Sequence, residues 1–262
     1  MSDEFGVWAY AITEHGAADV SGLTGVGGTT VRTAPAAGLT VLVSDVDLAE
    51  YGEAALRRNL EDLAWLEQVA RAHHHVIEEA ARLFPVLPMR LATVYSGDTG
   101  LAAALGGRRE DLHAALRRVG GRVEWGVKAY AAAGPDNGGR VPAAEPDTSD
   151  GTGGGAGLAY LRRRKAQLSV RQDAQRSAAA GVQAVHADLS RQAERARLYP
   201  PQAAQLTGYR DPMLLNAAYL LEAGRADGFA AAVQAAAAAH EELRVELTGP
   251  WPPYSFSGET EG

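Results

Sequence analysis

Thr248-Gly-Pro-Trp-Pro-Pro-Tyr-Ser-Phe256 stands near the C-terminal end of a sequence of 262 residues. Its three prolines fix φ and forbid a helix, so the stretch is expected to run as an extended, polyproline-like segment. Its aromatic side chains form a dense cluster in a chain of which only 6% is aromatic. An exposed cluster of this kind would be adhesive, so we expect it to dock on a protein surface. The residues expected to make that contact are Trp251, Pro252, Pro253, Tyr254 and Phe256.

The surface that receives this cluster has two interpretations. A structural clasp would fold the segment back on the body of the protein, whereas an interaction strip would present it to a partner. Each ring can bury on the order of 150–250 Å², which favours the clasp, because terminal segments that stay exposed are usually polar. Residues 249–262 are therefore expected to form a C-terminal tail that docks between two domains.

Composition excludes several classes of protein. The chain has no cysteine, which excludes disulfides, cysteine nucleophiles and thiolate metal sites. Its formal net charge of −7 argues against a nucleic-acid partner. No apolar run reaches the length of about eighteen residues that a membrane span needs, so no span is expected. The first residues lack the basic and apolar regions of a signal peptide.

The first half of the sequence is typical of an α+β domain, which we place at residues 1–120. β-type runs are expected near 7–12, 20–33, 39–46 and 86–95. Between the last two, apolar residues from Glu53 to Phe84 recur at spacings of three, four and seven, which predicts one long helix that Pro85 ends. Two short helices are expected near 101–105 and 110–119.

The second half predicts a domain over residues 121–248. Strands are expected at 122–130, 193–199, 213–221 and 243–247, and helices at 158–192 and 229–240, the latter with Asp227 as its N-cap. This order, strand, helix, strand, strand, helix, strand, is that of a modified ferredoxin-like (βαββαβ) domain with an extended first helix. Residues 134–157 are rich in glycine, proline and aspartate, so a flexible loop is expected there.

No arrangement of residues predicts a catalytic, cofactor or metal site. The glycine-rich stretch Gly22–Gly28 precedes a β-branched run and lacks a Lys-Ser/Thr pair, so a turn is favoured over a phosphate site. His73, His74 and His75 are consecutive on a helix and point about 100° apart, so they cannot converge on one metal. Asp45 and Asp47 have no neighbouring histidine in the sequence with which to form a dyad.

Basic residues cluster near the start of the second long helix, where the helix dipole disfavours cations. Arg162-Arg-Arg-Lys165 has two interpretations, a solvated face or a surface for an acidic partner. The polar first half of this helix favours a position in solvent or against a partner. The candidate residues for partner binding are Tyr160, Arg162, Arg163 and Arg164.

Six segments, in the same order along the chain, resemble the GvpL/GvpF family of gas vesicle proteins. Each is a weak signal alone, but the set spans nearly the whole chain. The segments are Leu23–Gly28, Ala72–His75 with Val86–Val94, Val123–Lys128, Ala159–Arg164, Asn216–Leu220 and Glu246–Phe256.

The resemblance implies a function that composition and periodicity do not show. It implies a non-enzymatic structural or assembly component of gas vesicles, the gas-filled buoyancy organelles of the cytoplasm, without a cofactor. The implied partners are the gas vesicle shell protein and other accessory gas vesicle proteins. It also implies an α+β first domain and a modified ferredoxin-like second one. Without the resemblance, a ferredoxin-like ligand-binding regulatory module or an unrecognised enzyme remains as the alternative.

Overall fold

The computed structural model describes residues 5–14, 20–132, 155–202 and 211–258. These residues form helices and two β-sheets, and the expected α+β class is confirmed. The chain packs as two units. The first joins Met1–Trp125, Leu220–Ala226 and Gly249–Gly262, and the second joins Gly126–Tyr219 and Asp227–Thr248. The domain boundaries expected from the sequence, 1–120 and 121–248, stay a prediction.

The sheet of the first unit is antiparallel and centred on β1, the strand that pairs with three others. Its order is β2-β3-β1-β4, and β5 also pairs with β1. A register shift between Ala9 and Ala11 interrupts the long β1–β3 ladder. The strands are β1 (Phe5–Thr13), β2 (Arg32–Ala36), β3 (Leu39–Asp47), β4 (Leu87–Pro88) and β5 (Val94–Tyr95).

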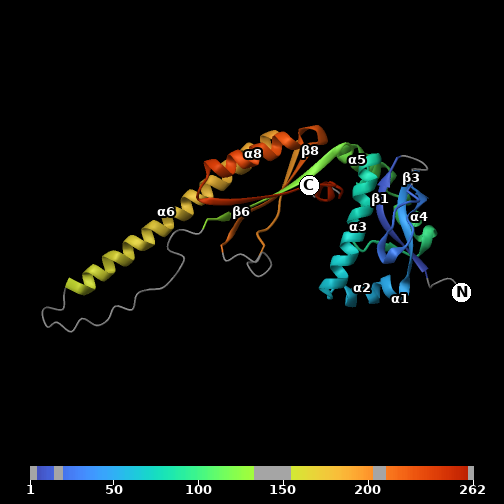
Figure 1. The fold of residues 1–262 in the computed structure, drawn as a ribbon, viewed down its shortest axis with the longest axis horizontal. Helices are drawn as coiled ribbons and strands as arrows, with labels where there is room; N and C mark the ends of the chain where they lie inside the picture. The colour runs from blue at the N-terminus through green and yellow to red at the C-terminus, as the bar shows by residue number, and fades with distance from the viewer. Residues whose placement is uncertain (1–4, 15–19, 133–154, 203–210, 259–262) are drawn as a thin grey trace. The chain divides into compact units, whose positions relative to one another are not determined.

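Helices cover both faces of this sheet. Every residue of β1 after Phe5 is buried, and Figure 1 shows α3 on one side of the sheet and α4 on the other. The face toward α3 holds the main core, in which Trp8 and Tyr10 pack against Val76 and Ile77. The helical segments of the first unit are the 3-10 turn η1 (Val26–Gly28), α1 (Leu48–Tyr51), α2 (Glu53–Asn59), α3 (Leu63–Leu83), α4 (Gly97–Gly106) and α5 (Arg109–Val119).

The expectation of one helix from Glu53 to Phe84 is wrong, because the chain leaves the helix between α2 and α3. Asp62 ends the interruption by capping α3, where its carboxylate accepts hydrogen bonds from the backbone N–H of Ala64 and Trp65 at 2.9 and 3.3 Å. Leu63, counted in the apolar stripe, is 79% exposed. An aspartate cap satisfies otherwise unpaired N–H groups, and here it outweighs the continuity of the stripe.

The strands expected at 86–95 and 20–33 are shorter than predicted. Residues between β4 and β5 still bond to β1, through Met89 N to Tyr10 O at 2.8 Å and Ala9 N to Thr93 O at 2.9 Å. The ladder is broken between them, where Ala92 has a φ of 61° and strand geometry is excluded. The glycine-rich stretch forms η1, so β2 begins only at Arg32.

The second unit is built on a four-stranded sheet of order β7-β8-β6-β9. The first residues of β6 and the last residues of β8 and β9 belong to the first unit. Its strands are β6 (Arg122–Ala131), β7 (Arg195–Leu198), β8 (Met213–Glu222) and β9 (Leu243–Trp251). The helical segments of this part of the chain are α6 (Gly155–Gln192), η2 (Ala223–Arg225), α8 (Ala226–Ala239) and η3 (Tyr254–Phe256).

Tyr219 on β8 joins the two long helices of the second unit to one face of the sheet. Its hydroxyl lies 2.8 Å from Nδ1 of His186 on α6. Its ring centroid lies 5.4 Å from that of Phe229 on α8. Because one side chain touches both helices, both lie on the face to which that side chain points. In Figure 1, α8 accompanies the C-terminal half of α6, while the N-terminal half (yellow) extends past it.

Three expectations for the second half of the chain are corrected. Helix α8 begins at Ala226, so Asp227 lies in its first turn and is not the N-cap. Strand β9 continues past Leu247 to Trp251, so the start of the tail is a strand rather than a polyproline segment. Pro250 is tolerated there because β9 is an edge strand, where a missing donor breaks no ladder. Of the expected loop 134–157, residues 134–154 lie outside the described residues, and Gly155–Gly157 open α6.

His73 on α3 is held as a neutral imidazole in the core of the first unit. The indole N–H of Trp8 donates to its Nδ1 at 2.9 Å, and this indole can only donate. The ring proton must therefore sit on Nε2, which donates to the carbonyl of Met89 at 3.1 Å. Burial, only partly offset by that backbone bond, lowers the pKa of His73 to about 4. Protonation of Nδ1 would bring its N–H against the N–H of Trp8 and would place a positive charge in the core.

This arrangement predicts acid sensitivity. As pH falls from about 6.5 toward 4, the unfolded chain binds a proton at His73 that the folded chain does not bind. The free energy of unfolding should therefore fall by about 3 kcal/mol from this group. In His73→Asn the amide oxygen can still accept from Trp8 but does not titrate, so its pH dependence should be flatter by that amount. Urea melts across this pH range make the measurement.

The matched control is His75→Asn, the same change at an exposed position of the same helix. It should keep the pH dependence of the unaltered protein. Equal slopes for the unaltered protein and His73→Asn would contradict a neutral buried His73.

Candidate functional site

The C-terminal tail, residues 249–258, lies against α3, α5 and the start of β6 in the first unit. It leaves β9 at Trp251 and closes with the 3-10 turn η3. Gly249 makes the close approach possible. Its φ is 123°, and a Cβ there would lie 2.8 Å from the carbonyl oxygen of Glu124. A side chain at this position would therefore push the tail away from β6.

Glu124 on β6 is the main polar anchor of the tail. Its side chain is buried, and its carboxylate accepts from the backbone N–H of Ser255 at 2.7 Å and from the Ser255 hydroxyl at 2.6 Å. A buried carboxylate is costly unless it is hydrogen-bonded, and bonds to a charged acceptor are stronger than neutral ones. Glu124 is therefore buried although it is a charged residue.

Arg118 on α5 anchors the end of the tail. Its Nε donates to the carbonyl of Phe256 at 3.1 Å and its Nη2 donates to the carbonyl of Gly258 at 2.9 Å. Phe256 ends η3 and Gly258 follows it, so no further helical turn donates to their carbonyls. A guanidinium has several N–H donors and can serve both carbonyls. Residues 257 and 258 therefore belong to the docked segment rather than to a frayed end.

His74 on α3 contacts two of the tail's aromatic rings. Its Nδ1 lies 3.0 Å from the hydroxyl of Tyr254, and the ring of Trp251 meets it edge-on with centroids 5.2 Å apart. Burial, with the nearby carboxylates of Glu124 and Glu78, raises the pKa of Tyr254 well above its ordinary value. The phenol is therefore protonated and able to donate to His74.

The predicted tail residues differ in how far they are buried. Pro252, Pro253 and Phe256 are buried and Tyr254 is half-buried, but Trp251 is 42% exposed. Trp251 is the most exposed of these residues and stands at the end of β9, an edge strand. That the tail lies between two domains stays a prediction. No local pattern linked the tail to Arg118, Glu124 or His74, each of which is more than 100 positions from it in the sequence.

The predicted basic helix residues lie far along the chain from the tail, in the second unit. Every residue of α6 from Tyr160 to Ser177 is exposed, including Arg162, Arg163 and Arg164. The hydroxyl of Tyr160 lies 3.5 Å from Nη1 of Arg164, one turn along the same helix. The basic residues are therefore displayed at the surface of α6.

The glycine-rich stretch Leu23–Gly28 has a structural role. The hydroxyl of Tyr10 accepts from the backbone N–H of Val26 at 2.9 Å and pairs with the hydroxyl of Ser44. Gly25 lies directly over that phenol, where a Cβ would be 2.1 Å from the hydroxyl oxygen. The stretch thus closes the core over a buried polar group, as the turn interpretation expected.

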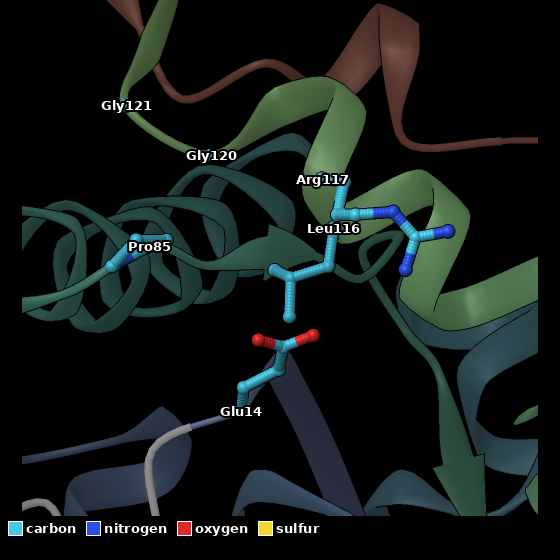
Figure 2. Close-up of a pocket in the computed structure, with 6 residues that line it drawn as sticks. All are labelled: Glu14, Pro85, Leu116, Arg117, Gly120 and Gly121. Atoms are coloured by element: carbon cyan, nitrogen blue, oxygen red, sulfur yellow. The ribbon is translucent and has the colours of Figure 1, made fainter.

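Two recesses lie in the first unit. One, of about 540 Å³, is bordered by the glycine-rich stretch, Trp65 and Arg71, and Arg71 pairs with Glu67. The other, of about 380 Å³, is drawn in Figure 2, where the carboxylate of Glu14 points toward Leu116. That carboxylate lies 2.8 Å from Nδ1 of His113. Within the ranges that the structure describes, no group of three potential metal ligands occurs.

The geometry of the tail predicts unequal costs for its two most apolar rings. Phe256→Ala should lower the free energy of unfolding by about 3 kcal/mol, because it empties a buried aromatic position. Trp251→Ala should cost clearly less, because much of that ring already contacts water. Urea denaturation of the two variants and the unaltered protein makes the comparison. A Trp251→Ala cost equal to or above that of Phe256→Ala would contradict this docking.

Comparison with known proteins covers almost the entire chain. The model of the family described as "Gas vesicle synthesis protein GvpL/GvpF" matches residues 6–258. Gas vesicle protein L of Streptomyces sp. (strain CB03234) is 38% identical over 240 residues, which are 92% of this chain and 88% of that protein. Gas vesicle protein F2 of Halobacterium salinarum is 25% identical over 95% of this chain and 91% of its own length.

Solved structures agree with the fold. The crystal structure of GvpF from Anabaena sp. PCC7120 superposes with a TM-score of 0.65 at 21% identity, over 98% of both chains. GvpF from Microcystis aeruginosa gives the same TM-score at 18% identity. In the described residues, no helix combines the length and apolar character required to cross a membrane. The resemblance carried by six short segments is confirmed: the chain belongs to the GvpL/GvpF family of gas vesicle synthesis proteins.

Proposed function

We propose that this protein is a non-enzymatic structural or assembly component of gas vesicles. It acts within the cytoplasm and contacts the gas vesicle shell protein and other accessory gas vesicle proteins. The observation that carries the proposal is the match of the family model to residues 6–258, together with 38% identity to a gas vesicle protein L over nearly the full chain. Membership of the family gives the gas vesicle role, and the mode of action is our proposal.

The engagement of the polar side chains supports a role without catalysis. His73 has both ring nitrogens occupied, by Trp8 and by Met89. The buried carboxylate of Glu124 accepts from the tail. In a catalytic site such groups would lie near a substrate. Here they form hydrogen bonds within the protein. Neither recess favours the alternative of a ligand-binding module or an unrecognised enzyme.

We propose that the second unit is a modified ferredoxin-like domain. Its elements follow the order strand, helix, strand, strand, helix, strand. In its sheet the fourth strand lies beside the first, the third comes next, and the second is at the far edge. The modification is the length of α6, which has 38 residues, whereas a helix that only crosses such a sheet needs about a third of that.

We propose separate tasks for the tail and for α6. The tail, through Pro252, Pro253, Tyr254 and Phe256, acts as a clasp, which its burial and hydrogen bonds support. The exposed half of α6, with Tyr160 and Arg162–Arg164, binds a partner. An exposed helix of this length is marginal in water when nothing packs on it, so binding would also stabilise it.

The proposed function predicts a loss of vesicles. A host that carries a complete gas vesicle gene cluster without this gene should form no vesicles or few, and the unaltered gene should restore them. A variant with Tyr160, Arg162, Arg163 and Arg164 changed to alanine should accumulate but fail to restore them. Electron microscopy and buoyancy of the cells give the measurement.

The matched control changes exposed arginines elsewhere, namely Arg57, Arg71 and Arg82. It removes the same number of guanidinium groups and should restore vesicles. Normal vesicle numbers in cells without the gene would contradict the proposed function. Full rescue by the α6 variant would contradict only the role of α6.

A further inference from the structure

The buried seam of α6 continues into its exposed half. In the packed half, Ala178, Val185 and Leu189 are buried and Val182 is half-buried. One position of the repeat, read backwards at intervals of seven residues, holds Leu189, Val182, Gln175, Leu168 and Leu161. Stepping back by seven from Ala178 and Val185 gives Arg171 and Arg164. A repeat of seven with two apolar positions is the pattern of helices that pack on other helices.

In the exposed half, one seam position is filled by Leu161, Leu168 and Gln175, so two of its three residues are apolar. Leu161 and Leu168 are 64% and 52% exposed, although they hold the same heptad position as the packed Leu189. The second position, filled by Ala178 and Val185 in the packed half, is filled by Arg164 and Arg171. A strict heptad drifts by about 20° per repeat on a straight helix, so a seam of this length follows a partner that winds around it.

The charge of this half-helix selects the partner's chemistry. Between Tyr160 and Ser177 six side chains are basic and Asp173 is acidic, in a chain whose formal net charge is −7. Among the described residues the ion pair of this stretch joins Arg176 to Asp173, on its own surface. Four of the six basic residues, Arg162–Lys165, are consecutive and exposed. Like charges this close repel one another, and an acidic partner would offset that repulsion.

We propose that residues 160–177 of α6 bind an acidic helix of another gas vesicle protein, in coiled-coil fashion. That helix has apolar residues facing Leu161 and Leu168 and carboxylates facing Arg164 and Arg171. Arginine and a carboxylate in adjacent seams form paired hydrogen bonds and fix the register. The inference rests on the proposed function only for the source of the helix, because the chemistry of recognition comes from the seam.

Val170 shows that exposure alone does not define the surface. It is 68% exposed, more than either leucine, but it is two residues from Leu168 and so points about 200° around the helix. Val170 is therefore a control for apolar exposure on the same helix, and the exposed Arg57 and Arg71 on helices of the first unit are controls for charge.

The experiment uses purified full-length protein and a synthetic helical peptide of about four heptads. The peptide has leucine at one seam position and glutamate at the other, and carries a fluorescent label for anisotropy titration. Leu161→Ala/Leu168→Ala should weaken binding about tenfold or more, while Val170→Ala leaves it unchanged. Arg164→Glu/Arg171→Glu should abolish binding of this peptide and create binding of a second peptide with lysine in place of glutamate. Far-UV circular dichroism checks that each variant is folded.

Arg57→Glu/Arg71→Glu, at exposed helix positions of the first unit, separates the seam from general attraction. It makes the same change of charge off the seam, and it should bind the glutamate peptide within about twofold of the unaltered protein. Equal loss in the two double reversals would overturn the proposal in favour of non-specific electrostatics. Binding of single-stranded DNA in preference to the peptide would also overturn it.

A second copy of the chain could also bind to residues 160–177, and sedimentation velocity tests this alternative. Self-association in sedimentation velocity that Leu161→Ala/Leu168→Ala removes would overturn the proposal of an acidic partner. A monomer that binds the glutamate peptide supports it. Vesicle formation in the absence of the gene would refute the proposed function and leave the peptide result standing, so the two failures are distinguishable.

Discussion

The buried carboxylate of Glu124 is the constraint on which the end of the chain depends. It lies on β6 and accepts two hydrogen bonds from Ser255, which is 131 positions away in the sequence. Removing the tail would leave those two charge-assisted hydrogen bonds unmade. Arg118 and His74 hold the same segment from two helices.

The core of the first unit uses polar groups in the same way. Trp8, His73 and Met89 form one chain of donors and acceptors, and Tyr10, Ser44 and Val26 form another. Each buried polar group here has a partner of defined geometry, so a substitution leaves an unpaired group rather than only a cavity. Such networks specify one packing more strictly than an apolar core does.

Helix α6 shows the opposite situation, a surface whose partner is not supplied by its own unit. The C-terminal half is organised by Tyr219 and the sheet, whereas residues 160–177 contact solvent. The same heptad runs through both halves, but arginine replaces the small apolar residues at one position. The proposal that this surface binds a partner agrees with the role proposed from the family.

Periodicity and residue type were sufficient for the α+β class and for most elements, because these signals are local and repeat along the chain, whereas the family came from the resemblance of six short segments. The resemblance also supplied the gas vesicle role, which no chemical motif indicated. Local signals failed where two of them competed. The cap of Asp62 divided a continuous apolar stripe, and Ala92 and Pro88 reduced an expected strand to short pairs.

The sequence by itself determined that the tail would be rigid and aromatic, because proline fixes φ wherever it occurs. Only the tertiary structure decided which rings are buried and which groups receive them. Phe256 is buried and Trp251 is not, and the anchor Glu124 lies 131 positions from Ser255, the residue that it holds. The physical reason is that burial depends on neighbours from distant parts of the chain, and a pattern along one strand or one tail carries no record of them.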